Sequence, residues 1–350
     1  MKASLLYRFL KVYCTVGLWF YCKEWRITGK HNVPKDGPIL FIANHQNAFL
    51  DAILMTCSTN LAPYYLARAT VFEKKWAAKL LSSIHIKPVY RIRDGFSTLK
   101  NNEAIFQQCV DLLSQNKCIL LFPEANHNSA YTTREFQKGF ARIALMYYKQ
   151  TGKSNLQILP TTLYFTEHHT YLSKVLVQVQ PTLKLADYKD SLSNEKKFYD
   201  DLKKDAEQAV NKDALILPLN ENYWSALARI KAQRPLQLPV TEILNHDKNN
   251  MNNAQVYAKE RKNSIITKTL ASIWRMYHIL PVWLVRYVVK HKIKDDQFYS
   301  SVTFAIGIFS IPAYYLLLSL LVLSFSTTST LAFGIPLVGL LLSVLRKYFG

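Results

Sequence analysis

The middle of the chain alternates short apolar runs with longer stretches in which apolar residues recur at helical spacing. Apolar runs of strand length occur at residues 38–43, 63–67, 87–91, 118–122, 156–165 and 174–179. Helix-like stretches separate these runs, and two examples are residues 72–84 and 97–115. The alternation predicts an α/β sandwich whose central sheet is largely parallel.

The pattern changes after a charged helical stretch near residues 194–211. Beyond it the apolar periodicity weakens, and residues 245–253 (NHDKNNMNN) are polar and lack apolar periodicity. We therefore expect the main domain to span residues 29–240 and a polar linker to occupy residues 241–265.

Two uncharged segments near the C-terminus have the composition of membrane helices. Residues 302–325 are long enough to cross a hydrocarbon core of about 30 Å, because a helix rises about 1.5 Å per residue. Residues 331–345 form a shorter segment, which we expect to be a tilted return helix or a re-entrant one. The alternative is a buried hairpin of a soluble protein.

Basic residues flank this pair of segments on both sides. They occur between positions 290 and 294 and again at positions 346 and 347, which favours a hairpin with both ends on the cytoplasmic side. Upstream, residues 276–289 are apolar and aromatic but contain Arg286, so an interfacial helix is expected there. We predict that residues 266–350 form a membrane-associated region.

The N-terminal segment is also rich in aromatic residues. Basic side chains interrupt it, so its longest uncharged run is residues 12–22, which is too short to span a bilayer. No small-residue cleavage site follows this run, so a signal peptide is not expected. We predict an uncleaved helix over residues 1–28 that lies on the membrane surface.

The charge of the chain narrows the class of its partners. The sequence has 44 Lys and Arg against 24 Asp and Glu, a formal net charge of +20, which favours an anionic partner. The basic residues are scattered rather than gathered into an arm, so a lipid membrane or a phosphorylated substrate is expected and nucleic acid is not. Five cysteines without CxxC spacing predict unpaired thiols and a catalytic part that faces the cytosol.

A histidine and an aspartate follow the first predicted strand, in the sequence Asn-His-Gln-Asn-Ala-Phe-Leu-Asp. Strand ends are where α/β sheets present reactive groups, and here they present His45 and Asp51. An imidazole accepts a proton from an alcohol, and a carboxylate on its other nitrogen fixes the tautomer. The pair therefore resembles the base and orienting acid of a triad in which the substrate's own hydroxyl is the nucleophile.

Other polar residues end two further predicted strands. Glu124 lies in Phe-Pro-Glu directly after one strand, and Arg91 and Arg93 end another. Guanidinium groups suit the recognition of phosphate, and a carboxyl group suits the orientation of a hydroxyl acceptor. A structural Arg–Glu ion pair is the alternative, and the two interpretations are compatible.

These motifs, in this order and followed by Ile-Leu-Pro at residues 158–160, resemble the glycerolipid acyltransferase family. That family includes lysophosphatidate and glycerol-3-phosphate acyltransferases. The resemblance covers roughly residues 25–180 and implies the sandwich fold of that family. It implies the following roles: His45 as general base, Asp51 as its partner, Arg91 or Arg93 as a phosphate contact, Glu124 in the acceptor site, Pro160 in the pocket lining, and Asn44, His127 and Lys138 as further substrate-binding residues.

The sequence departs from the family pattern at two places. Five residues separate His45 from Asp51, where four are usual, and the strand-to-helix turn must absorb the extra one. Ala125 and His127 stand where relatives commonly have Gly and Arg. The second departure removes a permanent charge, so phosphate binding is expected to rely on the remaining basic candidates, which are Arg91, Arg93, Arg134 and Lys138.

The resemblance implies transfer of a fatty acyl group to a hydroxyl of glycerol-3-phosphate or 1-acyl-glycerol-3-phosphate. The donor is expected to be acyl-CoA or acyl-acyl-carrier-protein, with the acyl chain between the N-terminal helix and the sheet. We expect no metal or further cofactor, since thiolates leave readily and no metal-ligand spacing occurs. Two alternatives remain: a different lipid acceptor such as an amino-acid lipid, or a membrane-surface binding protein that has lost the chemistry.

Overall fold

The computed structural model describes residues 4–89, 98–125, 128–132, 134–250, 265–325 and 329–349. Its strands are β1 (Glu24–Thr28), β2 (Ile39–Ala43), β3 (Tyr64–Arg68), β4 (Ile86–Val89), β5 (Cys118–Leu121), β6 (Gln157–Phe165), β7 (Lys174–Val179) and β8 (Leu183–Lys184). Its α-helices are α1 (Leu5–Tyr21), α2 (Ala48–Ser58), α3 (Lys75–Ser83), α4 (Thr98–Ser114), α5 (Gly139–Thr151), α6 (Glu195–Asn211), α7 (Tyr223–Gln233), α8 (Val240–Asn250), α9 (Ile265–Tyr277), α10 (Ile279–Lys292), α11 (Tyr299–Phe325) and α12 (Ser329–Phe349).

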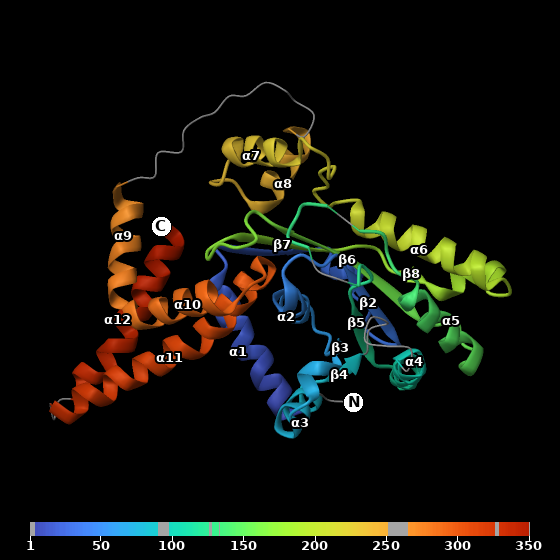
Figure 1. Ribbon diagram of the computed structural model, residues 1–350, viewed down its shortest axis with the longest axis horizontal. Coiled ribbons are helices and arrows are strands. Elements are labelled where there is room, and N and C mark those ends of the chain that lie inside the picture. The colour runs from blue at the N-terminus through green and yellow to red at the C-terminus, as the bar shows by residue number, and fades with distance from the viewer. Residues whose placement is uncertain are drawn as a thin grey trace.

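The strands form one eight-stranded sheet with the order β1-β7-β6-β2-β5-β3-β4, and β8 pairs with β6 (Figure 1). Strands β6, β2, β5, β3 and β4 are mutually parallel, whereas β7 and β8 run antiparallel to β6. The expected α/β architecture with a largely parallel sheet is therefore confirmed. Strand β2 lies at its centre, between β5 and β6.

The sheet is covered on both faces, which explains why its central strands are continuously apolar. In β2, Leu40 and Ile42 belong to a core cluster with α4, α5 and α6. The alternate residues Ile39, Phe41 and Ala43 belong to a second cluster with α1, α2 and the first part of α11. Successive side chains of a strand point to opposite faces, so β2 anchors both layers.

Two expected segments have a different structure. The predicted N-terminal helix over residues 1–28 was too long, because α1 ends at Tyr21 and Glu24–Thr28 form strand β1, which pairs with β7. The linker predicted over residues 241–265 was wrong for its first part, which belongs to α8. Its polar composition conceals an apolar stripe: Ile243 and Leu244 are buried against the core that α7 and α8 share with β7, and Asp247 is buried beside them. Residues 251–264 lie outside the described part of the chain.

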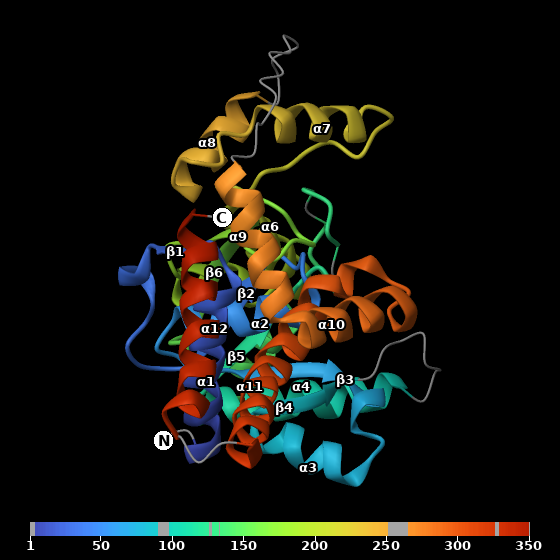
Figure 2. The ribbon, with the colours of Figure 1, turned by 90° about the vertical axis from the view of Figure 1, so that its left-hand side faces the viewer.

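Helices α9 to α12 form the remaining layer, which is grouped at one side of the sheet (Figures 1 and 2). Among the described residues, α11 and α12 are long and apolar enough to cross a membrane, with mean hydropathies of 2.2 and 1.5. Helix α12 is continuous from Ser329 to Phe349, as expected for a return helix. Its C-terminal end lies on the main domain, where Lys347 donates a hydrogen bond to the carbonyl of Trp19. Both ends of the helix pair are thus held on the same side.

Candidate active site

The turn between β2 and α2 holds the histidine and the aspartate together. Asp51 lies in the first turn of α2, is fully buried, and places Oδ2 2.9 Å from Nδ1 of His45. The same oxygen accepts hydrogen bonds from the backbone N–H groups of Gln46 and Asn47, each at 2.7 Å. One carboxylate therefore fixes both the imidazole and the backbone that carries it.

The extra residue in this turn is absorbed by a strained backbone conformation. Ala48 begins α2 with a φ of 46°, in the left-handed region that costs a non-glycine residue about 1 kcal/mol or more. With that one residue left-handed, the longer spacing still brings His45 within hydrogen-bond distance of Asp51. The expected pairing is thus present in the structure.

The imidazole of His45 is held in one orientation. Its ring stacks on Phe122, with centroids 3.9 Å apart and planes 9° from parallel, and its side chain is 16% exposed. Because Nδ1 donates to the carboxylate of Asp51, Nε2 is left with a lone pair. The arrangement can accept a proton from a hydroxyl group that approaches Nε2.

Glu124 lies beside the dyad in the turn that follows β5. Burial raises the pKa of this carboxyl group from 4.5 to about 8, and the negative charge of Asp51 adds to the rise. A hydrogen bond from the backbone N–H of His45 and the charge of Arg134 oppose it. Within the described part of the chain, Oε1 of Glu124 is buried without a hydrogen-bond partner. Near neutral pH this group is an uncharged acid that can donate a hydrogen bond.

The raised pKa of Glu124 predicts how stability depends on pH. Below pH 4.5 the carboxyl group is protonated in both the folded and the unfolded state. Between pH 4.5 and about 8 the unfolded state releases this proton and the folded state keeps it, so the free energy of unfolding falls as the pH rises. We expect Glu124→Gln to remove this fall, which urea unfolding at about pH 5 and pH 8 measures. The exposed Glu221→Gln is the matched control and should keep the wild-type slope. An unchanged slope in Glu124→Gln would contradict the assignment.

Ala125 takes the conformation that glycine usually provides at this point. Its φ is 60°, and its N–H donates to the carbonyl of Phe122 at 3.1 Å, which closes the turn that carries Glu124. The replacement of the family's glycine therefore leaves the shape of the turn intact, at a cost of about 1 kcal/mol in backbone strain.

Two of the expected substrate-binding residues have other partners. The buried amide of Asn44 donates to the carbonyl of Leu163 at 2.9 Å and accepts from its N–H at 2.7 Å. It thus extends the pairing of β2 with β6 by one residue, and both amide ends are occupied. Lys138 is about half exposed, and its Nζ lies 3.4 Å from Asp200 on α6, on the outer side of the domain. In the described structure Asn44 thus links β2 to β6 and Lys138 lies against α6, and the expected contact of either side chain with substrate stays a prediction.

The structure describes only some of the remaining residues that were expected to bind substrate. Arg91, Arg93 and His127 lie outside the described residues. Pro160 is buried in β6 opposite Ile42 of β2, so it lies within the sheet, one residue before the pairing of these two strands ends. Among the basic candidates in the described part of the chain, Arg134 is the one whose charge acts on Glu124.

Sequence reasoning missed the residues that brace the turn from its other side. The loop after β6 places Nε2 of His168 3.2 Å from Oε1 of Gln46, and its carbonyl accepts from Nδ2 of Asn47 at 3.0 Å. Burial lowers the pKa of His168 well below its usual value, so this histidine is neutral and donates to Gln46. No local motif marks His168, because its partners lie about 120 residues earlier in the chain.

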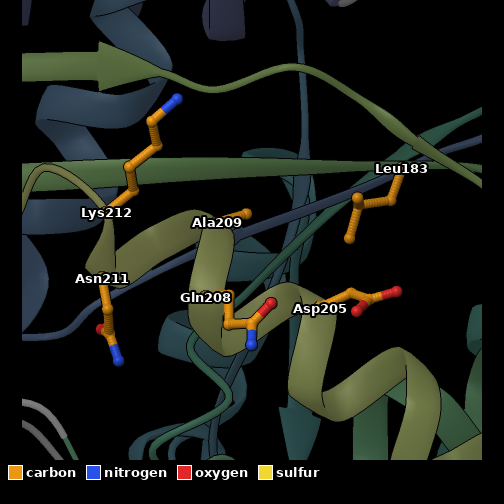
Figure 3. A pocket seen from close by; sticks show the side chains of 6 residues that line it. All are labelled: Leu183, Asp205, Gln208, Ala209, Asn211 and Lys212. Carbon is orange, nitrogen blue, oxygen red and sulfur yellow. The ribbon is translucent and has the colours of Figure 1, made fainter.

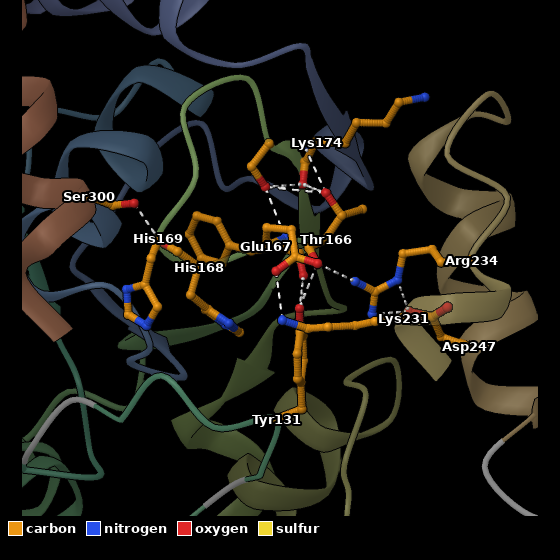
Figure 4. Close-up of polar contacts among 12 residues, drawn as sticks. Tyr131, Thr166, Glu167, His168, His169, Lys174, Lys231, Arg234, Asp247 and Ser300 are labelled. Carbon is orange, nitrogen blue, oxygen red and sulfur yellow. Dashed lines mark hydrogen bonds and ion pairs between the residues drawn. The ribbon is translucent and has the colours of Figure 1, made fainter. Parts of the chain in front are cut away.

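A buried ionic cluster fixes the same loop to α7 and α8 (Figure 4). Glu167 pairs with Lys231 at 2.6 Å, and Arg234 donates to Asp247 at 2.8 Å and to the carbonyl of Thr166. The charges of these groups are thus compensated by one another within the fold.

The surface is also hollowed away from the dyad. A shallow groove of about 630 Å³ runs along α6 (Figure 3). Its lining residues are Leu183, Asp205, Gln208, Ala209, Asn211 and Lys212. The residues of the dyad and of the turn after β5 are not among them. No group of three or more metal-ligating side chains occurs within the described ranges.

Comparison with known proteins agrees with this geometry. The family model "Acyltransferase" matches residues 24–164. A 1-acyl-sn-glycerol-3-phosphate acyltransferase of Borreliella burgdorferi is 25% identical over 190 residues, which are 51% of this chain and 71% of that one. Enzymes of the same name from Bacillus subtilis and Chlamydomonas reinhardtii are 27% and 29% identical, over 30% and 39% of this chain. The chain spans 49% and 37% of their lengths.

The comparison with solved structures gives a similarity of low score. The crystal structure of the 1-acyl-sn-glycerophosphate acyltransferase PlsC from Thermotoga maritima has a TM-score of 0.40 and 16% identity, and covers 58% of this chain and 78% of its own. The matched region from residue 24 to residue 164 contains both the His45–Asp51 turn and the turn of Glu124. Over residues 24–164, the chain is thus similar to the glycerolipid acyltransferase family.

Proposed function

We propose that this protein transfers a fatty acyl group from a thioester donor to the free hydroxyl of glycerol-3-phosphate or 1-acyl-glycerol-3-phosphate. The observation that carries the proposal is the contact of 2.9 Å between His45 and Asp51 at the carboxyl end of β2. A carboxylate that is fully buried and held by two backbone N–H groups orients the imidazole toward a substrate hydroxyl.

The proposed reaction begins with a proton transfer to Nε2 of His45. The acceptor oxygen attacks the thioester carbonyl as its O–H bond breaks, and Asp51 stabilises the imidazolium that forms. Collapse of the tetrahedral intermediate breaks the C–S bond, and the imidazolium returns the proton to the leaving thiolate. The products are an ester and a free thiol, so protons and bonds balance without a further co-reactant. Either acyl-CoA or acyl-acyl-carrier-protein would serve as donor.

Recognition of the acceptor phosphate is proposed for three arginine side chains. Arg91 and Arg93 follow β4, and Arg134 acts electrostatically on Glu124, whereas Lys138 is paired with Asp200. A protonated Glu124 would place no negative charge next to that phosphate. The printed names of the similar proteins support a phosphate-bearing acceptor.

The proposed location is a membrane, with the catalytic domain on the cytoplasmic side. Support comes from α11 and α12, whose exposed side chains are largely apolar, and from the basic residues near both ends of the pair. Because α11 starts on the domain and α12 returns to it, the two helices can enter and leave the bilayer on one side.

An acceptor panel tests the proposed function. The purified full-length chain is incubated with labelled acyl-CoA or acyl-acyl-carrier-protein and with glycerol-3-phosphate, 1-acyl-glycerol-3-phosphate or a hydroxylated amino-acid lipid. We expect turnover with a phosphate-bearing acceptor and at least tenfold less with the amino lipid, since a missing charged partner typically costs about 1.5 kcal/mol or more, which is over tenfold in rate. Turnover with the amino lipid alone would establish the alternative acceptor. Absence of transfer to every acceptor would favour a membrane-surface binding protein.

A further inference from the structure

The first turn of α11 makes direct contact with the turn that carries His45 and Asp51. Oγ of Ser301 accepts a hydrogen bond from the N–H of Leu50 at 2.9 Å and donates one to the carbonyl of Asn47 at 2.6 Å. Ser301 has no exposed surface, and Asn47 and Leu50 are also buried. A single hydroxyl of the C-terminal helix pair therefore bridges both backbone groups at the start of α2.

The side chain of the cap residue of α2 does not supply a capping acceptor; besides Ser301, the N–H of Leu50 contacts only the backbone carbonyl of Asn47, at 3.1 Å, among the contacts of the described residues. Asn47 precedes the helix, the position at which a side-chain oxygen normally accepts from the second or third N–H. In the described structure its side chain makes no cap hydrogen bond and instead donates to the carbonyl of His168. Leu50 is the third residue of α2, so Ser301 supplies the capping acceptor from another part of the chain.

Ser300 precedes Ser301 in the first turn of α11 and makes contacts on the other side of that turn. Its hydroxyl donates to the carbonyl of His168 (Figure 4). Its own carbonyl accepts from the hydroxyl of Tyr21 at 3.2 Å. Since His168 also contacts Gln46 and Asn47, the beginning of α11 touches both the catalytic turn and the loop after β6 that braces this turn. Its position is therefore determined by contacts on both sides.

We propose that Ser301 is a positioning residue for the His45–Asp51 dyad, and this inference rests on the proposed function. Asp51 receives its backbone hydrogen bonds from Gln46 and Asn47, and the carbonyl of Asn47 is the group to which Ser301 donates. Release of that carbonyl would let the strained turn at Ala48 relax and change the orientation of the imidazole. The catalytic turn is thus complete only when α11 is docked.

The test compares variants of the full-length protein in lipid vesicles. We expect Ser301→Ala to lower kcat about tenfold with both KM values changed less than about twofold, because a displaced base affects the chemical step more than binding. Ser301→Thr keeps the hydroxyl and should recover most of the loss. The matched control is Ser319→Ala, which removes a bond of 2.8 Å from α11 to the carbonyl of Ala332 and leaves the catalytic turn untouched.

Hydrogen exchange gives a readout that does not depend on turnover. In Ser301→Ala the amides of residues 46–50 should exchange at least about tenfold faster than in wild type, and in Ser319→Ala they should not. If the wild type transfers no acyl group, the proposed function fails and exchange alone decides the positioning role. Wild-type kcat or unchanged exchange in a folded Ser301→Ala protein overturns the inference. Should that variant not fold, Ser301→Cys replaces it, and wild-type exchange in the cysteine variant overturns the inference equally.

Discussion

Replacement of His45 by alanine is expected to lower kcat for acyl transfer by at least about 10³-fold, since it removes the group that accepts the hydroxyl proton. The fold should survive, because His45 is partly exposed and its main neighbour is the ring of Phe122. Transfer of labelled acyl groups to 1-acyl-glycerol-3-phosphate measures the loss. Flotation with vesicles should show unchanged membrane association, because α11 and α12 are untouched.

A second histidine provides the control for this variant. His31 is exposed in the short helix that precedes β2, so His31→Ala makes the same chemical change away from the dyad. It should retain turnover within about twofold of wild type, as surface substitutions usually do. Turnover near the wild-type rate in His45→Ala would exclude this histidine as the base, and with it the proposed mechanism.

Asp51→Asn is expected to lower kcat by about 10²- to 10⁴-fold while the protein remains folded. An amide oxygen in place of Oδ2 can still accept from His45, Gln46 and Asn47, but its neutral group no longer stabilises the imidazolium. The amide nitrogen would replace Oδ1, which is buried and has no partner among the described residues, so a loss of about 1–3 kcal/mol in stability is expected. Steady-state kinetics and urea unfolding measure the two effects.

Two further variants make this prediction sharper. Asp51→Ala leaves all three donors without an acceptor and should destabilise the protein more than the asparagine variant, by about 3 kcal/mol or more. Asp36→Asn changes an exposed aspartate and should affect neither kcat nor stability. If Asp51→Asn kept wild-type turnover, orientation of the imidazole by this carboxylate would not be part of catalysis.

The sequence predicted the sheet because its central strands are buried on both faces. Strands such as β2 and β6 are continuously apolar, and that pattern is local. The dyad was predicted for a related reason: His45 and Asp51 are close in sequence, so one turn brings them together. Strand β1 was not predicted, because Glu24–Thr28 alternate only weakly and become a strand through pairing with β7, about 150 residues later.

The roles of single polar residues were harder to predict from their chemistry. Asn44 and Lys138 have side chains suited to a substrate, yet their structural partners, Leu163 and Asp200, are distant in sequence. The helical stripe of α8 was concealed by its asparagines, although Ile243, Leu244 and Asp247 recur at helical spacing. A polar composition indicates a linker only where no such stripe is present.

The hydrogen bond from Leu50 to Ser301 joins residues that are 251 positions apart. The ribosome makes the first of these long before the second, and domains fold largely in the order of synthesis. The sheet and α2 are therefore available while α11 has not yet been made, and the start of α2 lacks its capping hydroxyl during that time. Newly made chains should consequently complete the turn of His45 and Asp51 only after α11 has been made and has docked against α2.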